Sequence, residues 1–96
     1  MPRVFYSDRA LSDLERIFDF LALRDSDSGA AATSSILDAT SVLQRHPMIG
    51  CPVQGNLREL VIAQGRLGYV ALYRYFPERE QVEILAIRHQ LEAGYE

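Results

Sequence analysis

The sequence predicts a two-layer α+β fold in which a helical hairpin packs on one face of a mostly antiparallel sheet. Three runs rich in Leu, Val, Ile and Tyr lie between Leu57 and His89 and are separated by short turn segments. Two earlier stretches carry apolar residues at helical spacing, and a short β-prone segment precedes them. The predicted element order is therefore β-α-α-β-β-β. This pattern leaves the order of the strands in the sheet open.

Length and composition set the scale of the protein. The chain has 96 residues, of which 48% are hydrophobic, so we expect one domain over residues 1–96 with a single core. All ten positive residues are arginine, and the net charge is −3. No lysine amine is therefore present as an acid or base, and the acidic balance argues weakly against tight non-specific binding to nucleic acid.

The N-terminal half predicts one strand followed by two helices. Arg3–Tyr6 is a short strand candidate, and Ser7 is placed to cap a helix from about Asp8 to Leu23. The predicted buried residues of this helix are Ala10, Leu11, Leu14, Ile17, Phe18 and Leu21. The predicted outward residues are Arg9, Asp13, Arg16 and Asp19, of which Asp13 and Arg16 can pair across one turn. We interpret that side as a solvated face.

The second helix begins after the polar segment 24–29, with Asp27 or Ser28 as its cap, and ends before His46-Pro47. Its predicted buried residues are Ala32, Ile36, Ala39, Thr40 and Leu43. The residues from Pro47 to Gly55 are expected to form a loop. Because the hairpin returns the chain to the end of the sheet that it left, the next strand, Leu57–Gln64, is expected to run antiparallel to the first.

The C-terminal half predicts a meander. Its strands are Leu57–Gln64, Tyr69–Phe76 and Val82–His89, joined by turns at Gly65–Gly68 and Pro77–Gln81. The strands are apolar along nearly their whole length, so we expect both faces of the sheet to be covered. Tyr69, Tyr73 and Tyr75 share one face by alternation, which is more typical of core or interface packing than of base stacking.

Few residues are available for metal or redox chemistry. The single Cys51 cannot form an internal disulfide, and one thiol with two histidines is too few for a typical structural zinc site, so no metal or cofactor is expected. The N-terminus lacks an apolar run of signal-peptide length, and no segment approaches the roughly 20 apolar residues of a membrane span. We therefore expect a soluble cytoplasmic protein.

The candidate catalytic residues are near the C-terminus. His89 follows Arg88 at the end of the last strand and precedes Tyr95. Its imidazole could therefore serve as a general base or contact a phosphate. The alternative, which is the commoner case, is an ordinary histidine at a strand end. His46 and Cys51 have no motif around them that indicates catalysis. The nucleophile-elbow, Walker, dinucleotide-binding and zinc-protease motifs are absent, which removes most support for hydrolase and nucleotide-binding functions.

Arginines within or beside the meander are the candidate binding residues. They are Arg58, Arg66, Arg74 and Arg88. A sheet can gather them into one cationic patch. Equally, each can pair with a nearby carboxylate, such as Glu59 or Glu83.

Taken together in order, several short segments resemble the RelE/ParE superfamily, the toxins of bacterial type II toxin–antitoxin modules, also described as plasmid-stabilisation proteins. The matching segments are Ser7-Asp8-Arg9-Ala10 with Asp13-Leu14, Leu43 to Pro47 with Gly50, Arg58-Glu59-Leu60, Gly68-Tyr69, Leu72 to Tyr75, Ile84 to His89, and Tyr95. The resemblance covers nearly the whole chain and is carried by the ordered set, since no single segment is specific.

The resemblance implies one of two activities. RelE-like toxins cut messenger RNA on the ribosome with lysines, arginines and a C-terminal tyrosine, whereas ParE-like toxins poison DNA gyrase. Here Val70 stands where RelE-like enzymes carry an arginine, and only Tyr95 clearly carries over. Arg88, His89 and Tyr95 would form a reduced catalytic set. We therefore expect a ParE-like toxin, with a RelE-like nuclease, or a degenerate antitoxin-binding module without toxicity, as the alternatives.

The resemblance also implies partners. A cognate antitoxin is expected to lay an extended or helical segment over the toxin, and an oligomer of toxin and antitoxin is a further expectation. Exposed apolar surface on the sheet would then be the interface with the antitoxin. Arg58, Arg66, Arg74, Arg88 and Tyr95 are the predicted partner- or target-binding residues, with gyrase as the target or, in the alternative, the ribosome and its messenger RNA.

Overall fold

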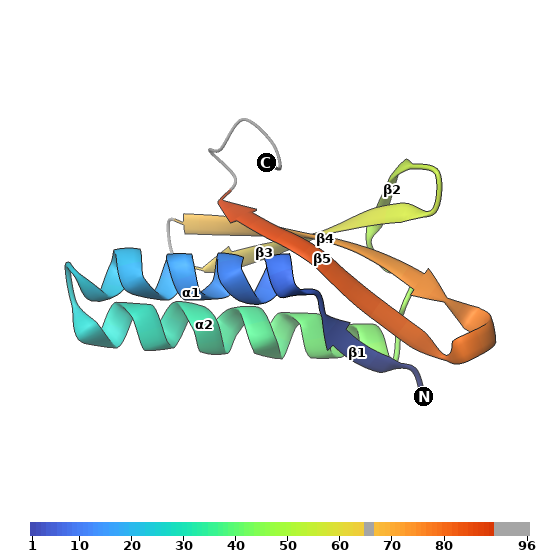
Figure 1. The fold of residues 1–96 in the computed structure, drawn as a ribbon, viewed down its shortest axis with the longest axis horizontal. Coiled ribbons are helices and arrows are strands. Elements are labelled where there is room, and N and C mark those ends of the chain that lie inside the picture. Colours follow the sequence, from blue (N-terminus) through green and yellow to red (C-terminus); the bar gives the residue numbers. More distant parts are fainter. Residues whose placement is uncertain (65–66, 90–96) are drawn as a thin grey trace.

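Two helices lie side by side against one face of a five-stranded sheet in the computed structural model, which describes residues 1–64 and 67–89 (Figure 1). The elements are β1 (Arg3–Tyr6), α1 (Asp8–Ala22), α2 (Ser26–Ser41), the 3₁₀ turn η1 (Val42–Gln44), β2 (Cys51–Gln54), β3 (Leu57–Gln64), β4 (Leu67–Phe76), the 3₁₀ turn η2 (Pro77–Arg79) and β5 (Gln81–His89). The predicted two-layer α+β fold is confirmed. Neither described helix has the length and apolar character needed to cross a membrane.

Helix α1 begins where the sequence predicts. The Ser7 hydroxyl accepts a hydrogen bond from the Ala10 amide at 3.0 Å and so satisfies one of the free donors of the first turn. The buried residues are Ala10, Leu14, Ile17 and Leu21. The prediction was wrong for Leu11 and Phe18, which are 53% and 40% exposed. At about 100° per residue both lie to one side of the buried stripe, and the sheet reaches only the stripe itself.

Helix α2 is capped by Asp25, so the predicted caps were wrong. The Asp25 carboxylate accepts hydrogen bonds from the Asp27 amide at 3.1 Å and from the Ser28 hydroxyl at 3.2 Å. The extended backbone of Asp25 aims its side chain at the first turn, which is what a cap requires. The predicted stripe is otherwise confirmed, with Ala39 partly buried and Ala32, Ile36, Thr40 and Leu43 buried.

The two helices pack closely because a glycine lies between them. A Cβ atom at Gly29 would lie 2.7 Å from the Phe18 carbonyl oxygen. No real side chain fits in that space. Gly29 therefore sets the distance between α1 and α2 near their connection.

The strand order is β1-β5-β4-β3-β2, with β1 parallel to β5 and every other pair antiparallel. Strand β3 therefore runs in the same direction as β1, and the predicted antiparallel direction was wrong. The error came from β2, because residues that were predicted as loop pair with β3 and add one reversal of the chain. Pro52 within β2 donates no ladder hydrogen bond, which suits its place at the edge of the sheet.

Candidate functional site

Strand alternation divides the candidate residues between the two faces of the sheet. The inner face, toward the helices, carries Tyr69 and Tyr73, which are buried in the core, and Tyr75, which packs against it. The predicted core packing of these tyrosines is confirmed. The outer face carries the residues between them, including Val70 and Arg74.

The helices cover only the inner face, although both faces were predicted to be covered (Figure 1). On the outer face Val70 and Ala86 are buried, but Val61 is 59% exposed. Further exposed apolar side chains lie on the edge strands, Phe5 in β1 and Val53 in β2, and on or just after α1: Leu11, Phe18, Phe20 and Leu23. Exposed apolar side chains that a partner can cover are therefore present on both the sheet and α1.

A β-bulge in β5 determines where Arg88 lies. Tyr73 pairs with Ile84 and Leu72 with Ala86, so Leu85 is an extra residue that faces no partner in β4. After the bulge the alternation of β5 is reversed. Arg88 consequently pairs with Val70 and lies on the outer face.

The two outer-face arginines lie beside carboxylates. The Arg74 guanidinium is 3.3 Å from Glu83 Oε1, and Arg88 Nη2 is 3.9 Å from Glu59 Oε2. Arg88 also donates a hydrogen bond to the His89 carbonyl at 3.2 Å. Of the two possibilities left open by the sequence, carboxylate pairing is the arrangement found for Arg74 and Arg88.

The His89 side chain lies on the opposite face of the sheet from Arg88. It pairs across the strands with the core residue Tyr69, and its ring stands edge-on to the Tyr69 ring with centroids 5.5 Å apart. Burial raises the pKa of the Tyr69 hydroxyl. Because consecutive residues of a strand point to opposite faces, the His89 imidazole and the Arg88 guanidinium do not converge on one point.

Arg58 holds the loop after α2. It pairs with Tyr73 and so points to the inner side of the sheet, where its Nη1 donates hydrogen bonds to the carbonyls of Met48 at 2.9 Å and Gly50 at 2.7 Å. Arg58 therefore does not share a face with Arg74 and Arg88. The predicted residues Arg66 and Tyr95 lie outside the described residues.

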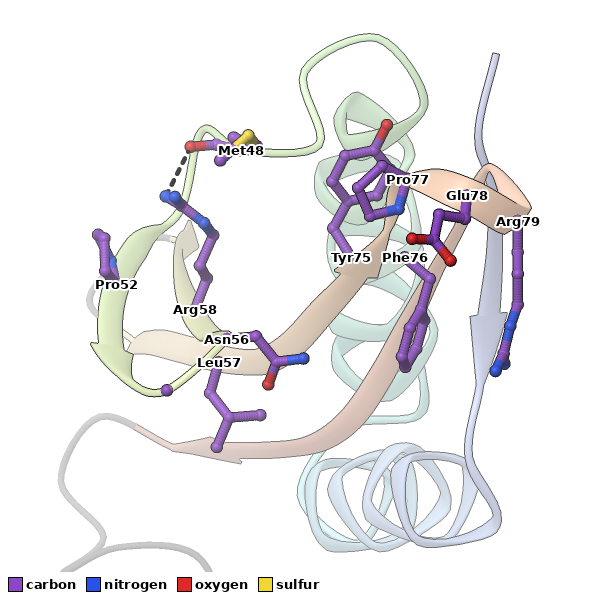
Figure 2. A pocket seen from close by; sticks show the side chains of 11 residues that line it. Met48, Pro52, Asn56, Leu57, Arg58, Tyr75, Phe76, Pro77, Glu78 and Arg79 are labelled. Carbon is purple, nitrogen blue, oxygen red and sulfur yellow. Dashed lines mark hydrogen bonds between the residues drawn. The ribbon is translucent and has the colours of Figure 1, made fainter.

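A cleft of about 470 Å³ lies between the β2–β3 turn and η2 (Figure 2). Its apolar lining includes Leu57, Tyr75 and Phe76. The Arg74 and Arg79 guanidiniums lie 5.2 Å and 4.9 Å from the centroid of the Phe76 ring, a distance typical of cation–π contacts. No sequence motif indicated a role for Phe76 or Arg79, and only their three-residue spacing could have indicated the contact.

The remaining candidates form no catalytic cluster. His46 and Cys51 are both exposed. Within residues 1–64 and 67–89, no group of three or more His, Cys, Asp and Glu side chains is arranged to hold a metal ion.

Asp13 was assigned to a solvated face, and that interpretation was wrong. Its side chain is mostly buried, and its carboxylate accepts a hydrogen bond from the Ile87 amide at 2.8 Å. Arg9 and Arg16 lie 3.9 Å and 3.7 Å from its oxygens, so the predicted Asp13–Arg16 pair is confirmed. Helical spacing alone could not reveal a contact with a strand 74 residues away.

Residues 4–94 match the family model of the ParE toxin of the type II toxin–antitoxin system parDE. The chain belongs to this family. The chain is also similar to a relative called Toxin RelE3, from Caulobacter vibrioides, which is 35% identical over 92 residues; the alignment covers 96% of this chain and 98% of the relative. The predicted membership of the RelE/ParE superfamily is confirmed, and the protein is a type II toxin.

Solved structures show the same fold. The chromosomal ParDE system of P. aeruginosa superposes with a TM-score of 0.75 at 22% identity, covering 93% of this chain and 96% of that one. The E. coli RelBE complex gives 0.68 at 12% identity, covering 91% and 94%. RelBE2 of Mycobacterium tuberculosis gives 0.60 at 26% identity, covering 94% and 100%. ParE-named and RelE-named proteins thus share the architecture of this ParE-family toxin, and the fold alone does not separate their activities.

Proposed function

We propose that this ParE-family toxin inhibits growth by binding DNA gyrase in the cytoplasm, and that it is not a nuclease. The observation that carries the proposal is the placement of Arg88 and His89 on opposite faces of β5. Cleaving RNA requires a base for the 2′-hydroxyl and cationic groups for the developing charge, both at the same phosphate. Arg88 and His89 do not meet that requirement together.

The surroundings of Arg88 support the same conclusion. Its neighbour across the strands is Val70, a buried apolar residue that offers no charge to a phosphate. Its guanidinium lies beside Glu59, whose carboxylate offsets part of its positive charge. The outer face is therefore better suited to recognising a protein surface than to stabilising a transition state. We propose that Arg74 and Arg88 contact the target, and that Arg66 and Tyr95, which only the sequence supports, contribute as well.

We also propose a cognate antitoxin that covers the exposed apolar side chains of α1. Leu11 and Phe18 lie one above the other at a seven-residue spacing and are both exposed. An amphipathic helix or extended segment with apolar residues would bury them. The similar solved structures are toxin–antitoxin complexes or systems, which supports such a partner and an assembly that contains more than one chain.

A second candidate function is ribosome-dependent cleavage of messenger RNA. It is favoured by one observation, the RelE name of the Caulobacter relative at 35% identity. In that case Tyr95 with Arg88 would have to supply the chemistry that His89 is not placed to give.

Two assays on purified protein separate these functions. We expect the protein to inhibit supercoiling by gyrase or to trap cleaved DNA, and to leave messenger RNA on ribosomes uncut. Arg88→Ala should weaken gyrase inhibition by about tenfold or more, because a close charged contact is lost. The matched control is Arg45→Ala, since Arg45 is exposed after η1 on the helical layer, and it should retain full inhibition.

Cleavage of ribosome-bound messages with normal gyrase activity would contradict the proposal and establish the second function. If expression is harmless and neither assay responds, the chain is a degenerate member that binds only an antitoxin.

A further inference from the structure

The first strand covers only half of its neighbour. Strand β1 pairs with β5 from Gln81 to Ile84, and the chain then turns into α1 at Ser7. Among residues 1–64 and 67–89, no strand pairs with that edge of β5 beyond Ile84. Backbone N–H and C=O groups that are buried need hydrogen-bond partners, so this segment must find them elsewhere.

The N-cap residue Ser7 and the α1 residue Asp13 supply hydrogen-bond partners to this segment. The Ser7 hydroxyl donates a hydrogen bond to the Leu85 carbonyl at 2.9 Å, while the Ser7 amide donates to the Ile84 carbonyl at 2.9 Å. Two helical turns later, the Asp13 carboxylate accepts from the Ile87 amide at 2.8 Å. These contacts are made at and on either side of the bulge residue Leu85, so Ser7 and the start of α1 take the place of a strand along the irregular part of β5.

The bulge in turn sets the face on which Arg88 lies. If β5 lost the bulge by slipping one residue, every side chain after it would change faces. Arg88 would then point toward the helices, and the buried Ile87 would point outward. Ile87 precedes Arg88 directly, so the hydrogen bond to Asp13 fixes the backbone next to the arginine.

We propose that Asp13 is a positioning residue for Arg88. It acts through the Ile87 amide, keeps the bulge in place and thereby presents Arg88 on the outer face. A carboxylate suits this role because a hydrogen bond to a charged acceptor is stronger than one to a neutral acceptor. The functional consequence rests on the proposed target-binding role of Arg88, whereas the structural consequence does not.

The test uses Asp13→Ala, Asp13→Asn and the control Asp19→Ala. Asp19 is exposed on the same helix. Hydrogen exchange of individual amides is measured by NMR on full-length protein made by cell-free synthesis, and growth is followed after induction in cells. We expect Ile87 to exchange about tenfold faster or more in Asp13→Ala, with Val82 unchanged as an internal reference. Asp13→Asn keeps a neutral acceptor and should give an intermediate rate, and it replaces the alanine variant if that variant does not fold.

The growth assay distinguishes this proposal from the proposed function. Faster Ile87 exchange together with reduced toxicity in both Asp13→Ala and Arg88→Ala supports both. Faster exchange with toxicity unchanged in both variants keeps the positioning role and overturns the role of Arg88 at the target. Unchanged exchange of Ile87 in the Asp13 variants overturns the positioning role, whatever the toxicity. Loss of toxicity in Asp19→Ala as well would assign the effect to the surface of α1 and would also overturn it.

Discussion

The Gly50 amide donates a hydrogen bond to the Tyr73 hydroxyl at 2.9 Å, deep within the protein. Tyr73 is fully buried on the inner face of β4, and Gly50 ends the loop that follows α2. The same loop is held from the other side by Arg58, which donates to the Gly50 carbonyl. The loop between the helical layer and the sheet is thus fixed by side chains from both β3 and β4.

Gly50→Ala should destabilise the protein by about 1–3 kcal/mol or more because the site has no room for a methyl group. A Cβ atom there would lie 2.6 Å from Tyr73 Cε1 and 2.8 Å from the Glu59 carbonyl oxygen. Urea unfolding of the variant and the parent measures the difference. An ordinary surface substitution changes the free energy of unfolding by about 0.5 kcal/mol or less. A change of that size in Gly50→Ala would show that the loop moves aside freely.

Tyr73→Phe should cost about 1–3 kcal/mol because it leaves the buried Gly50 amide without its acceptor. The matched control is Tyr75→Phe, because Tyr75 is in the same strand and partly buried, and its hydroxyl makes no hydrogen bond within residues 1–64 and 67–89. Tyr75→Phe should change the free energy of unfolding by less than about 0.5 kcal/mol. If Tyr73→Phe and Tyr75→Phe lower the free energy of unfolding equally, the hydrogen bond from Gly50 contributes nothing to stability.

Stability should fall as the pH rises above about 10, the usual pKa of tyrosine. Burial raises the pKa of Tyr6, Tyr69 and Tyr73 in the folded protein. Below the unfolded pKa each hydroxyl is protonated in both states. Above it the unfolded state releases the proton first, so the stabilisation is lost as the pH rises toward the folded pKa.

Tyr69→Phe tests this dependence, because burial is the one cause of its raised pKa. Melting temperatures at pH 8 and at alkaline pH should differ less in the variant than in the parent. An equally steep alkaline decline in both proteins would assign the loss of stability to other groups.

Ile36→Ala and Leu14→Ala should each destabilise the protein by about 2–5 kcal/mol because they leave cavities in the core. Both side chains are buried between the helices and the sheet. Leu11→Ala removes the same atoms as Leu14→Ala from an exposed position on the same helix, and we expect a change below about 1 kcal/mol. Urea titration that ranks Leu11 with Leu14 would mean that the face of α1 is assigned wrongly.

Tyr95→Phe should change growth inhibition only slightly if the target is gyrase, because the aromatic ring that would contact the target is kept. The substitution removes only a hydroxyl, and losing an acid or base would slow a nuclease by about 10²–10⁴-fold. Toxicity is measured by induced expression, with thermal melting as the check on folding. Loss of toxicity in a folded variant, with ribosome-bound messages cut by the parent protein, would favour the nuclease instead.

Local pattern determined much of the architecture. Helical spacing identified Leu14, Ile17 and Leu21 as core, and alternation put Tyr69 and Tyr73 on one face, because both periods are properties of the backbone itself. The ordered set of short motifs was sufficient to predict membership of the RelE/ParE superfamily. The cap of α1 was predicted correctly because Ser7 is the evident capping residue next to the helix. The cap of α2 was predicted wrongly because Asp25 and Asp27 are both possible acceptors.

Tertiary structure decided what joins distant segments. The parallel pairing of β1 with β5, the additional edge strand β2 and the bulge at Leu85 each depend on which chain lies alongside, and sequence periodicity carries no information about that. The bulge is the most consequential, since one extra residue put Arg88 on the opposite face from the one that simple alternation after Ile84 would give. For the same reason Asp13 looked like a solvated side chain in the sequence. Its acceptor role exists only because folding places the Ile87 amide 2.8 Å away.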